Sequence, residues 1–548
     1  MLSIKKTWYR YSFLVILLIM GMLLLFSITA CNGNVNTEEE ARETGQEQQN
    51  TGQDELEKPV ARLAGGEDWG LPNPYARNPR GPAERKVGLI FDTLVERAAD
   101  GMVPWLAEDW AISDDGKTYT FYLRRDVKWH DGVEFTSDDV VFSINYQSEH
   151  PPVSTMDYSI FDRVEKVDDY TVRLYTTEPS APFLYEMTSI YMLPEHIWGN
   201  VDDPLQFTDD DSLIGTGPFT LESYNREQGS YRFIAAADFW GPEHRVQAVE
   251  FVPVGDEILA LRQGDIHIGS VPADLVEQFE SDPEFSIIEP PGLWSMRLHF
   301  NLRDIPVLQQ KEVRQAFAYA IDQDDLVNKV LRGAGVPGNP GMLPPDHIWH
   351  NPDVPQYEYD PEEALRLLER VGLEIAEGKL LDQNGQPVTF DLLTSGEGDY
   401  ARTAELVKNY LEEIGIQINI QSGDRLTVDE SWTEGNFELN INGHGGWGRD
   451  ADVLRQNFAA GGSPGYNTGW ANQEFDRLAL EQFSMFNEDE RRAIIDGMQV
   501  ILADELPLLM LYYTTGYYAY RHDVYDGWVL LYDHHTIDNK VSFLVEEY

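Results

Sequence analysis

The chain has 548 residues, of which 42% are hydrophobic and 12% aromatic, so it can bury more than one core and we expect two or three lobes. It carries 94 acidic residues against 41 lysines and arginines, a formal net charge of −53. This charge excludes nucleic acid as a partner, because its phosphates would be repelled. The acids are spread along the body, which favours a solvated surface at high ionic strength over a patch for a cationic substrate.

The first thirty residues have the pattern of an export signal. Three basic residues precede the apolar run "FLVILLIMGMLLLFSI" (13–28), and small residues follow it. The run is also long enough to be an uncleaved membrane anchor. However, "ITAC" (28–31) resembles the bacterial lipobox, in which the cysteine becomes the lipidated first residue of the mature protein. We therefore predict a signal peptide over 1–30 and lipidation of Cys31, the single cysteine of the chain.

The next segment, 31–57, is predicted to be a disordered tether. It holds almost no large apolar residues and many Glu, Gln, Asn and Thr, so it cannot offset the entropy lost on ordering. Together with a lipid anchor, it would hold a folded body off the extracytoplasmic face of the cell membrane.

Short strands and turns are predicted over 60–300. "GKTYTFYLRRDVKW" (116–129) alternates apolar and polar residues between Gly-containing turns and indicates a hairpin. The segment 170–176 alternates in the same way. A helix is predicted over 136–147, with Thr136 or Ser137 as its N-cap.

Helices and strands alternate over 300–512, which predicts an α/β fold. We expect helices over 360–372 and 401–415, and strands over 387–394, 416–420 and 437–442. A strand, a helix and a strand at this spacing form a βαβ unit, so the strands should be parallel. Ligands of open α/β sheets bind beyond the carboxyl ends of strands. The loops "TSGEGDY" (394–400) and "GHGGWGRDAD" (443–452) could therefore face one crevice.

Signatures of catalysis and of cofactors are weak or missing. The chain has no G-x-x-x-x-G-K-[ST] and no G-x-S-x-G, and "HIWH" (347–350) and "HH" (534–535) lack partners at metal-ligand spacing. We therefore expect no cofactor, no metal site and no enzyme. A pair of acidic residues for glycoside hydrolysis needs only to meet in space, so an extracytoplasmic hydrolase stays open as an alternative.

Recognition is the positive signal. Four tryptophans lie in loops rich in Gly or Pro, namely Trp69, Trp294, Trp447 and Trp470. A loop aromatic can line a ligand pocket, or it can simply pack at the edge of a lobe. Asp450 could pair with a ligand ammonium. Alternatively, Asp450 forms a salt bridge with Arg449 or another local cation, or caps the following helix, a role that Asp452 fits better.

Several stretches together resemble the peptide/nickel class (family 5) of extracellular solute-binding proteins of ABC importers. They are found at 103–143, 214–224, 313–335, 359–372 and 467–478, and the first, which includes "DDGKTYTFYLRRDVKWHDGVEFTSDDVVFS", is the most specific.

The resemblance implies a two-lobed periplasmic-binding-protein-like (type II) fold with an extra inserted domain, closing around a ligand. Lobe I would comprise 58–85, 213–300 and 513–548. The inserted domain would be 86–212 and lobe II 301–512.

Site residues also follow from the resemblance. In peptide-binding members, an Asp a few residues after "GW" in this loop holds the ligand amine; the matching residue is Asp450, with Trp447 lining the pocket. Thr394 stands where the dipeptide-binding branch has an arginine for the ligand carboxylate, and Arg402 or Arg449 could substitute. The nickel-binding branch uses a loop histidine, and His444 is nearby.

We therefore predict a monomeric, lipid-anchored substrate-binding protein that captures a peptide-like solute and delivers it to an ABC permease in the membrane. Trp69 and Trp294 complete the candidate ligand-binding residues. An oligosaccharide or a nickel chelate is the alternative ligand, since stacked tryptophans or His444 would suit them.

Overall fold

The computed structural model describes residues 58–78, 81–98, 101–152, 156–289, 294–445, 447, 450–462, 469–531 and 537–545. The predicted signal peptide, Cys31, the predicted tether and Arg449 lie outside the described residues.

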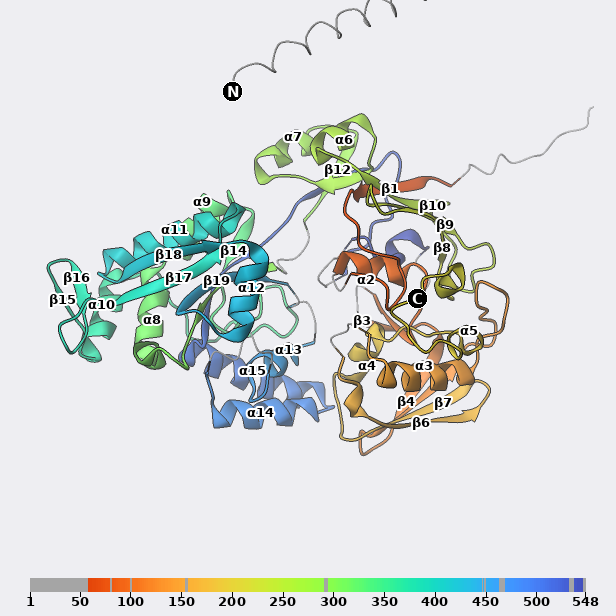
Figure 1. Ribbon diagram of the computed structural model, residues 1–548, viewed down its shortest axis with the longest axis horizontal. Coiled ribbons are helices and arrows are strands. Elements are labelled where there is room, and N and C mark those ends of the chain that lie inside the picture. Colours follow the sequence, from red (N-terminus) through yellow and green to blue (C-terminus); the bar gives the residue numbers. More distant parts are fainter. Residues whose placement is uncertain are drawn as a thin grey trace, which may run out of the picture. The chain divides into compact units, whose positions relative to one another are not determined.

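A seven-stranded sheet forms the base of the first lobe (Figure 1). Its strand order is β12 (Phe285–Ile288), β21 (Tyr518–Arg521), β11 (Ile268–Ser270), β1 (Val60–Gly65), β10 (Ala248–Pro253), β9 (Ser230–Ala235) and β8 (Phe219–Asn225). Strand β1 pairs in parallel with β10 and β11, and β21 pairs with the other side of β11, so segments from both ends of the described body meet in one sheet.

A six-stranded sheet forms the base of the second lobe. Its strand order is β14 (Gly335–Pro337), β20 (Leu508–Thr514), β13 (Trp294–Phe300), β19 (Leu439–His444), β17 (Thr389–Ser395) and β18 (Gln417–Gly423). Strand β17 pairs in parallel with both β18 and β19, which confirms the predicted βαβ unit and the added strand.

A four-stranded antiparallel sheet lies within the segment predicted to be an inserted domain. Its strand order is β4 (Ala107–Ile112), β5 (Thr118–Leu123), β7 (Thr171–Thr176) and β6 (Phe161–Asp168). The hairpin predicted over 116–129 lies earlier in the chain, because β5 is the only described strand in that segment and it pairs with β4 across the turn at Gly116. The apolar residues of β5 point into a core. Two-strand ribbons join β2 (Val95–Ala98) to β3 (Gly101–Pro104) and β15 (Glu374–Ala376) to β16 (Lys379–Leu381).

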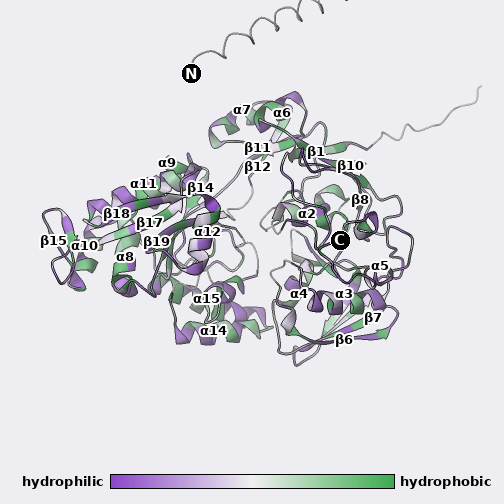
Figure 2. Ribbon diagram, viewed as in Figure 1, coloured by the Kyte–Doolittle hydropathy of each residue, from purple (hydrophilic) through white to green (hydrophobic). Residues whose placement is uncertain are grey.

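The helices carry hydrophilic and hydrophobic residues together, as expected when one face packs on a sheet (Figure 2). They are α2 (Gly81–Gly88), α3 (Ser137–Glu149), α4 (Phe183–Glu186), α5 (Glu195–Trp198), α6 (Glu257–Gln263), α7 (Val276–Glu280), α8 (Lys311–Ala320), α9 (Gln323–Val330), α10 (Pro361–Arg370), α11 (Gly398–Glu413), α12 (Arg425–Glu434), α13 (Val453–Phe458), α14 (Gln473–Phe483) and α15 (Glu488–Glu505). Thr136 caps α3 with a complete capping box, as predicted, and the Asp360 side chain caps α10.

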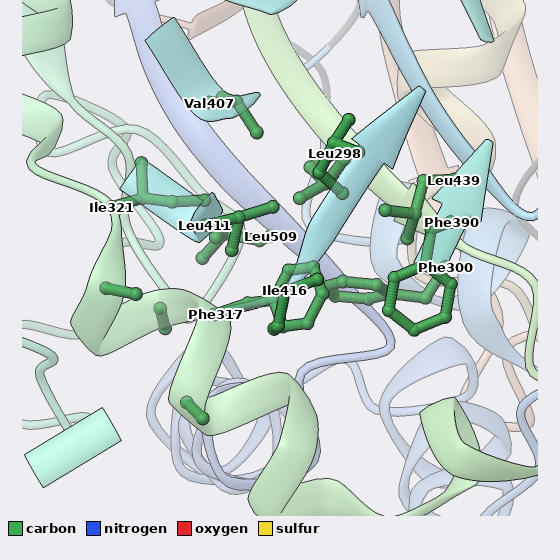
Figure 3. Packing of buried hydrophobic residues seen from close by; sticks show 14 of the residues in the cluster. Leu298, Phe300, Phe317, Ile321, Phe390, Val407, Leu411, Ile416, Leu439 and Leu509 are labelled. Atoms are coloured by element: carbon green, nitrogen blue, oxygen red, sulfur yellow. The ribbon is translucent and has the colours of Figure 1, made fainter. Parts of the chain in front are cut away.

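In the core of the six-stranded sheet, three aromatic rings pack one against the next (Figure 3). The ring of Phe317, on α8, lies 5.4 Å from that of Phe300 on β13 and 6.0 Å from that of Phe390 on β17. Helix α11 covers the same sheet with the buried face that its sequence predicts, which includes Ala404, Val407 and Leu411.

Among the described elements, the chain crosses from the seven-stranded to the six-stranded sheet after β12 and returns after β20. Strand β13 therefore belongs to the second sheet, because it pairs with β19 and β20, although our predicted boundary at residue 300 placed it in lobe I. The other domain boundaries stay predictions.

A buried ion cluster fastens the C-terminal segment to the body. The Lys540 Nζ lies 2.8 Å from the Asp92 Oδ1 and 2.6 Å from the Glu96 Oε2, and the side chains of Lys540 and Asp92 are 5% and 0% exposed. Trp105 Nε1 and Thr216 Oγ1 also donate to Asp92. Burial opposes the charge of Lys540, but the two carboxylates outweigh it and raise the Lys540 pKa.

The variant Lys540→Ala should lose about 3–5 kcal/mol of unfolding free energy, because it leaves a buried carboxylate without its cation. Denaturant unfolding measures the loss. The matched control is Lys58→Ala, which removes an exposed lysine 2.6 Å from Glu243 and should leave stability unchanged. Equal effects of the two variants would contradict the assigned role of the buried cluster.

Candidate functional site

The two predicted loops meet at the carboxyl ends of β17 and β19. Gly443, on β19, is buried, and a Cβ atom there would lie 2.7 Å from the Trp294 Nε1 and 2.9 Å from the Tyr400 Oη. Tyr400 follows β17 on α11, and Trp294 begins β13. Glycine is therefore needed at this position because two aromatic side chains approach its backbone closely.

Trp447 anchors the loop that follows β19. Its side chain is 1% exposed, and its Nε1 donates to the Ser295 Oγ at 2.9 Å. The guanidinium of Arg297 lies 4.8 Å from the centre of the Trp447 ring, and the Arg297 Nε donates to the same Ser295 Oγ at 2.8 Å. Burial lowers the pKa of Arg297 to about 9.

Asp450 forms a two-pronged ion pair with Arg491 of α15. The Arg491 Nη1 donates to the Asp450 Oδ2 at 2.8 Å, and the Arg491 Nη2 donates to the Oδ1. The two side chains are 15% and 7% exposed. The sequence left open a salt bridge to Arg449 or another local cation, whereas this partner lies 41 residues away on α15. Parallel hydrogen bonds of this kind fix the orientation of the carboxylate.

Asp452 extends the same polar network. Its carboxylate accepts hydrogen bonds from the Arg455 Nε and the Gln482 Nε2, both at 2.6 Å. Gln482 in turn accepts from Arg491 at 3.0 Å. Asp452 stands at the N-cap position of α13, but the expectation that its side chain caps the helix is wrong, because the carboxylate makes these side-chain bonds instead.

A small void separates Asp450 from the segment around α4. Its volume is about 20 Å³, enough for one water-sized group. Asp450, Asp452, Val453 and Gln456 line it from the second lobe, and Met156, Pro182, Tyr185, Glu186 and Ser189 line it from the other side.

A larger cavity of about 660 Å³ lies between the two large-sheet lobes. Arg402 and Asp399, at the start of α11, line it, together with Glu257 of α6 and Tyr517. The Arg402 side chain is 55% exposed, and its Nη1 lies 3.5 Å from the Asp399 Oδ1. Thr394, by contrast, is fully buried, and its Oγ1 donates to the Ile441 carbonyl at 3.4 Å.

The remaining candidate tryptophans make contacts outside the Asp450 ion pair. Trp69 packs on the core of the seven-stranded sheet, and its backbone N–H donates to the Tyr231 Oη at 2.8 Å. Trp294 lies at the start of β13, with the Arg425 guanidinium 5.9 Å from its ring centre. Trp470 packs edge-on against Phe475 at 5.2 Å.

Sequence reasoning missed Arg491, Arg297 and Ser295. Arg491 lies in the first turns of α15 in the acidic run "NEDERRA", which carries no local sign of a partner 41 residues earlier. In the sequence, Arg297 and Ser295 have the pattern of ordinary strand residues. Their contacts with Trp447 arise only because β13 pairs with β19.

No group of three or more His, Cys, Asp or Glu side chains suited to a metal ion occurs among the described residues. The His350 Nδ1 accepts from the Asn339 Nδ2 at 3.1 Å, and "HH" (534–535) lies outside the described range. Over the same range, no helix combines the length and apolar character needed to cross a membrane.

Two lobes joined by two crossings, with ion-paired carboxylates and a cavity between them, define a two-lobed binding protein. The chain belongs to the bacterial extracellular solute-binding proteins, family 5, whose model matches residues 101–466. The predicted family and fold class are thereby confirmed. Members of this family are binding proteins of transport systems, so the chain is a substrate-binding protein and not an enzyme.

Characterised relatives cover most of the chain. It is 30% identical to the dipeptide-binding protein of Escherichia coli K12 over 478 residues, covering 79% of this chain and 85% of that protein. It is 31% identical to the heme-binding protein A of Haemophilus influenzae over 464 residues, covering 78% and 82%.

Solved structures share the fold. NikA from Brucella suis in complex with Fe(III)-EDTA superposes with a TM-score of 0.76 at 22% identity, covering 89% of this chain and all of that one. AppA from Bacillus subtilis in complex with a nonapeptide superposes with a TM-score of 0.71 at 23% identity, covering 89% of this chain and 100% of that one.

The variant Gly443→Ala should lose about 1–3 kcal/mol of unfolding free energy, because the new methyl group would overlap Trp294 and Tyr400. Denaturant unfolding, followed by tryptophan fluorescence, measures this. Gly396→Ala is the matched control after the neighbouring strand, since its Cβ would lie 3.6 Å from the Ser422 Cβ. If the two variants were equally stable, the close approach at Gly443 would be of no consequence.

Proposed function

We propose that the protein captures a peptide-like solute between its lobes as a monomer, holds the ligand's amino group at Asp450, and delivers the ligand to an ABC permease. The observation that carries this proposal is the oriented carboxylate of Asp450 at a void between the second lobe and the segment around α4, beyond the carboxyl end of β19. The names of relatives support it, since they include a dipeptide-binding protein and an oligopeptide-binding protein of Bacillus subtilis.

The Asp450 carboxylate keeps room for a ligand while it is paired. Its Oδ1 accepts from Arg491 and from the Asp452 backbone N–H, and its Oδ2 accepts from Arg491. A carboxylate has about four lone-pair sites, so one site on Oδ2 remains for an ammonium group. Arg491 acts here as a positioning residue, which holds that site in one direction.

The ligand's carboxylate is assigned to Arg402. Its exposed guanidinium lines the larger cavity beside the N-terminus of α11, where the helix dipole also favours a negative charge. Thr394 is buried and donates to the Ile441 carbonyl within the sheet, so it does not bind the ligand's carboxylate in this proposal. Arg449 stays a second candidate from the sequence.

The tryptophans have supporting roles in this proposal. Trp447 acts through the loop that it anchors against Ser295, and Trp294 supports the same loop at Gly443. Trp69 belongs to the opposite lobe, where it would complete the wall of the site after closure.

Asp450→Asn should weaken binding of trialanine by about 1.5–3 kcal/mol, or about ten- to a hundredfold, because the charge-assisted hydrogen bond is lost. Isothermal titration calorimetry measures the dissociation constant. N-acetyl-trialanine lacks the ammonium group and should bind the wild type and the variant equally. In the same series, Arg402→Gln should lower the affinity for trialanine but leave that for trialanine amide unchanged.

The N-acetylated peptide separates amine recognition from misfolding, because a distorted site would weaken both peptides alike. Asp353→Asn, which changes an exposed carboxylate of the second lobe, serves as the matched control. Equal losses for the free and acetylated peptides would remove the amine-binding role of Asp450. Binding of heme or a nickel chelate in preference to every peptide would overturn the peptide proposal.

Cys31→Ser should abolish incorporation of labelled palmitate and release the protein from the membrane fraction, because lipidation needs the thiol. Fractionation of cells grown with the label measures both. A wild-type chain that stays in the membrane without incorporating palmitate would instead identify the apolar run 13–28 as the anchor.

A further inference from the structure

The end of α14 docks on the region of the four-stranded sheet. The Ala181 backbone N–H donates to the Phe483 carbonyl at 2.7 Å, and the Phe483 side chain is 7% exposed within the core cluster of that region. Phe486 also lies against Gly116, where the β4–β5 turn has a φ of 67° and no side chain to exclude the ring. These contacts join the second lobe to the region of the four-stranded sheet.

Glu186, the last residue of α4, lies beside this contact with its side chain half-buried. It lines the void of about 20 Å³ opposite Asp450 and Asp452. Three carboxylates therefore line one small space between the second lobe and the segment around α4.

The nearby cations are already paired. Arg491 is bound by Asp450 and Arg455 by Asp452, so Glu186 faces two ion pairs and not a free guanidinium. Two further carboxylates contribute electrostatically: Asp157 repels the charge of Glu186, and Glu178 attracts that of Arg455. The neighbouring Tyr185 hydroxyl accepts a hydrogen bond from the Arg97 Nη1 at 2.8 Å. Burial raises the pKa of Glu186 to about 8, and the negative charges of Asp452 and Asp450 act in the same direction. The positive charge of Arg455 acts in the opposite direction.

We propose that Glu186 makes closure of the lobes proton-dependent. Its carboxyl group enters the interface protonated and ionises when the lobes separate and water reaches it. A cationic group of a bound solute in this void would favour the Glu186 carboxylate, so the device is tested on the protein without solute.

The sign follows from linkage. Separation returns the Glu186 pKa from about 8 towards its ordinary value of 4.5, so the closed form binds up to one proton more than the open form. Closure is therefore most favoured below pH 4.5, and it weakens as the pH rises from 4.5 to about 8. The limit for one proton is about tenfold in the closure constant per pH unit, and above pH 8 the dependence ends.

The Ala181 amide is a direct reporter, because its hydrogen bond crosses the interface. Hydrogen–deuterium exchange of the full-length protein in detergent, resolved by mass spectrometry and divided by the intrinsic rate at each pH, gives its protection factor. In the wild type this factor should fall between pH 5 and pH 8, towards the limit of about tenfold per unit. In Glu186→Gln it should be independent of pH and above the wild-type value at pH 8.

Two controls complete the design. The Thr177 amide, which donates to the Ile160 carbonyl at 2.8 Å within the four-stranded sheet region, should show no such fall in either protein. Glu149→Gln, at an exposed glutamate of α3, should keep the wild-type profile, and Glu186→Ala should repeat the profile of Glu186→Gln if the latter folds poorly. A wild-type Ala181 profile without slope, or a slope kept by both Glu186 variants, overturns the proposal.

Discussion

The ion pair between Asp450 and Arg491 is the interaction on which the candidate site depends. A carboxylate beyond a strand end has no cation of its own, and in this acid-rich chain an unpaired one would be costly to enclose. Arg491 supplies the cation from α15, and Gln482 links the pair to Asp452 and Arg455. The segment 450–455 is thereby held between α14 and α15, where its carboxylates face the other lobe.

Most elements of the fold could be predicted because their causes are local. The capping box at Thr136 requires residues that are neighbours in sequence, and so do the Asp360 cap and the apolar alternation of β5. The parallel pairing of β17 and β18 follows from the single helix between them, since such a crossover leaves little choice.

The parts that sequence reasoning missed depend on residues brought together from far along the chain. Nothing near Arg491 indicates Asp450, and the place of β13 in the second sheet is decided by β19 and β20, which follow it by more than a hundred residues. The glycines of the loop 443–452 permit close approach to the backbone, but nothing in the sequence indicates that Trp294 and Tyr400 are the side chains that approach Gly443.

The distribution of the few cations explains why closure is sensitive to charge. Arg314 is buried and donates to the Leu308 and Glu505 carbonyls, while Arg297 lies under Trp447 and Lys540 serves Asp92. These cations are engaged inside the lobes, so they are not available to the surfaces that meet when the lobes close. The negative charge of an interface rich in carboxylates must then be neutralised by existing ion pairs, by a cationic ligand group or by a proton. Glu186 lines this interface, and its raised pKa lets it take up the proton.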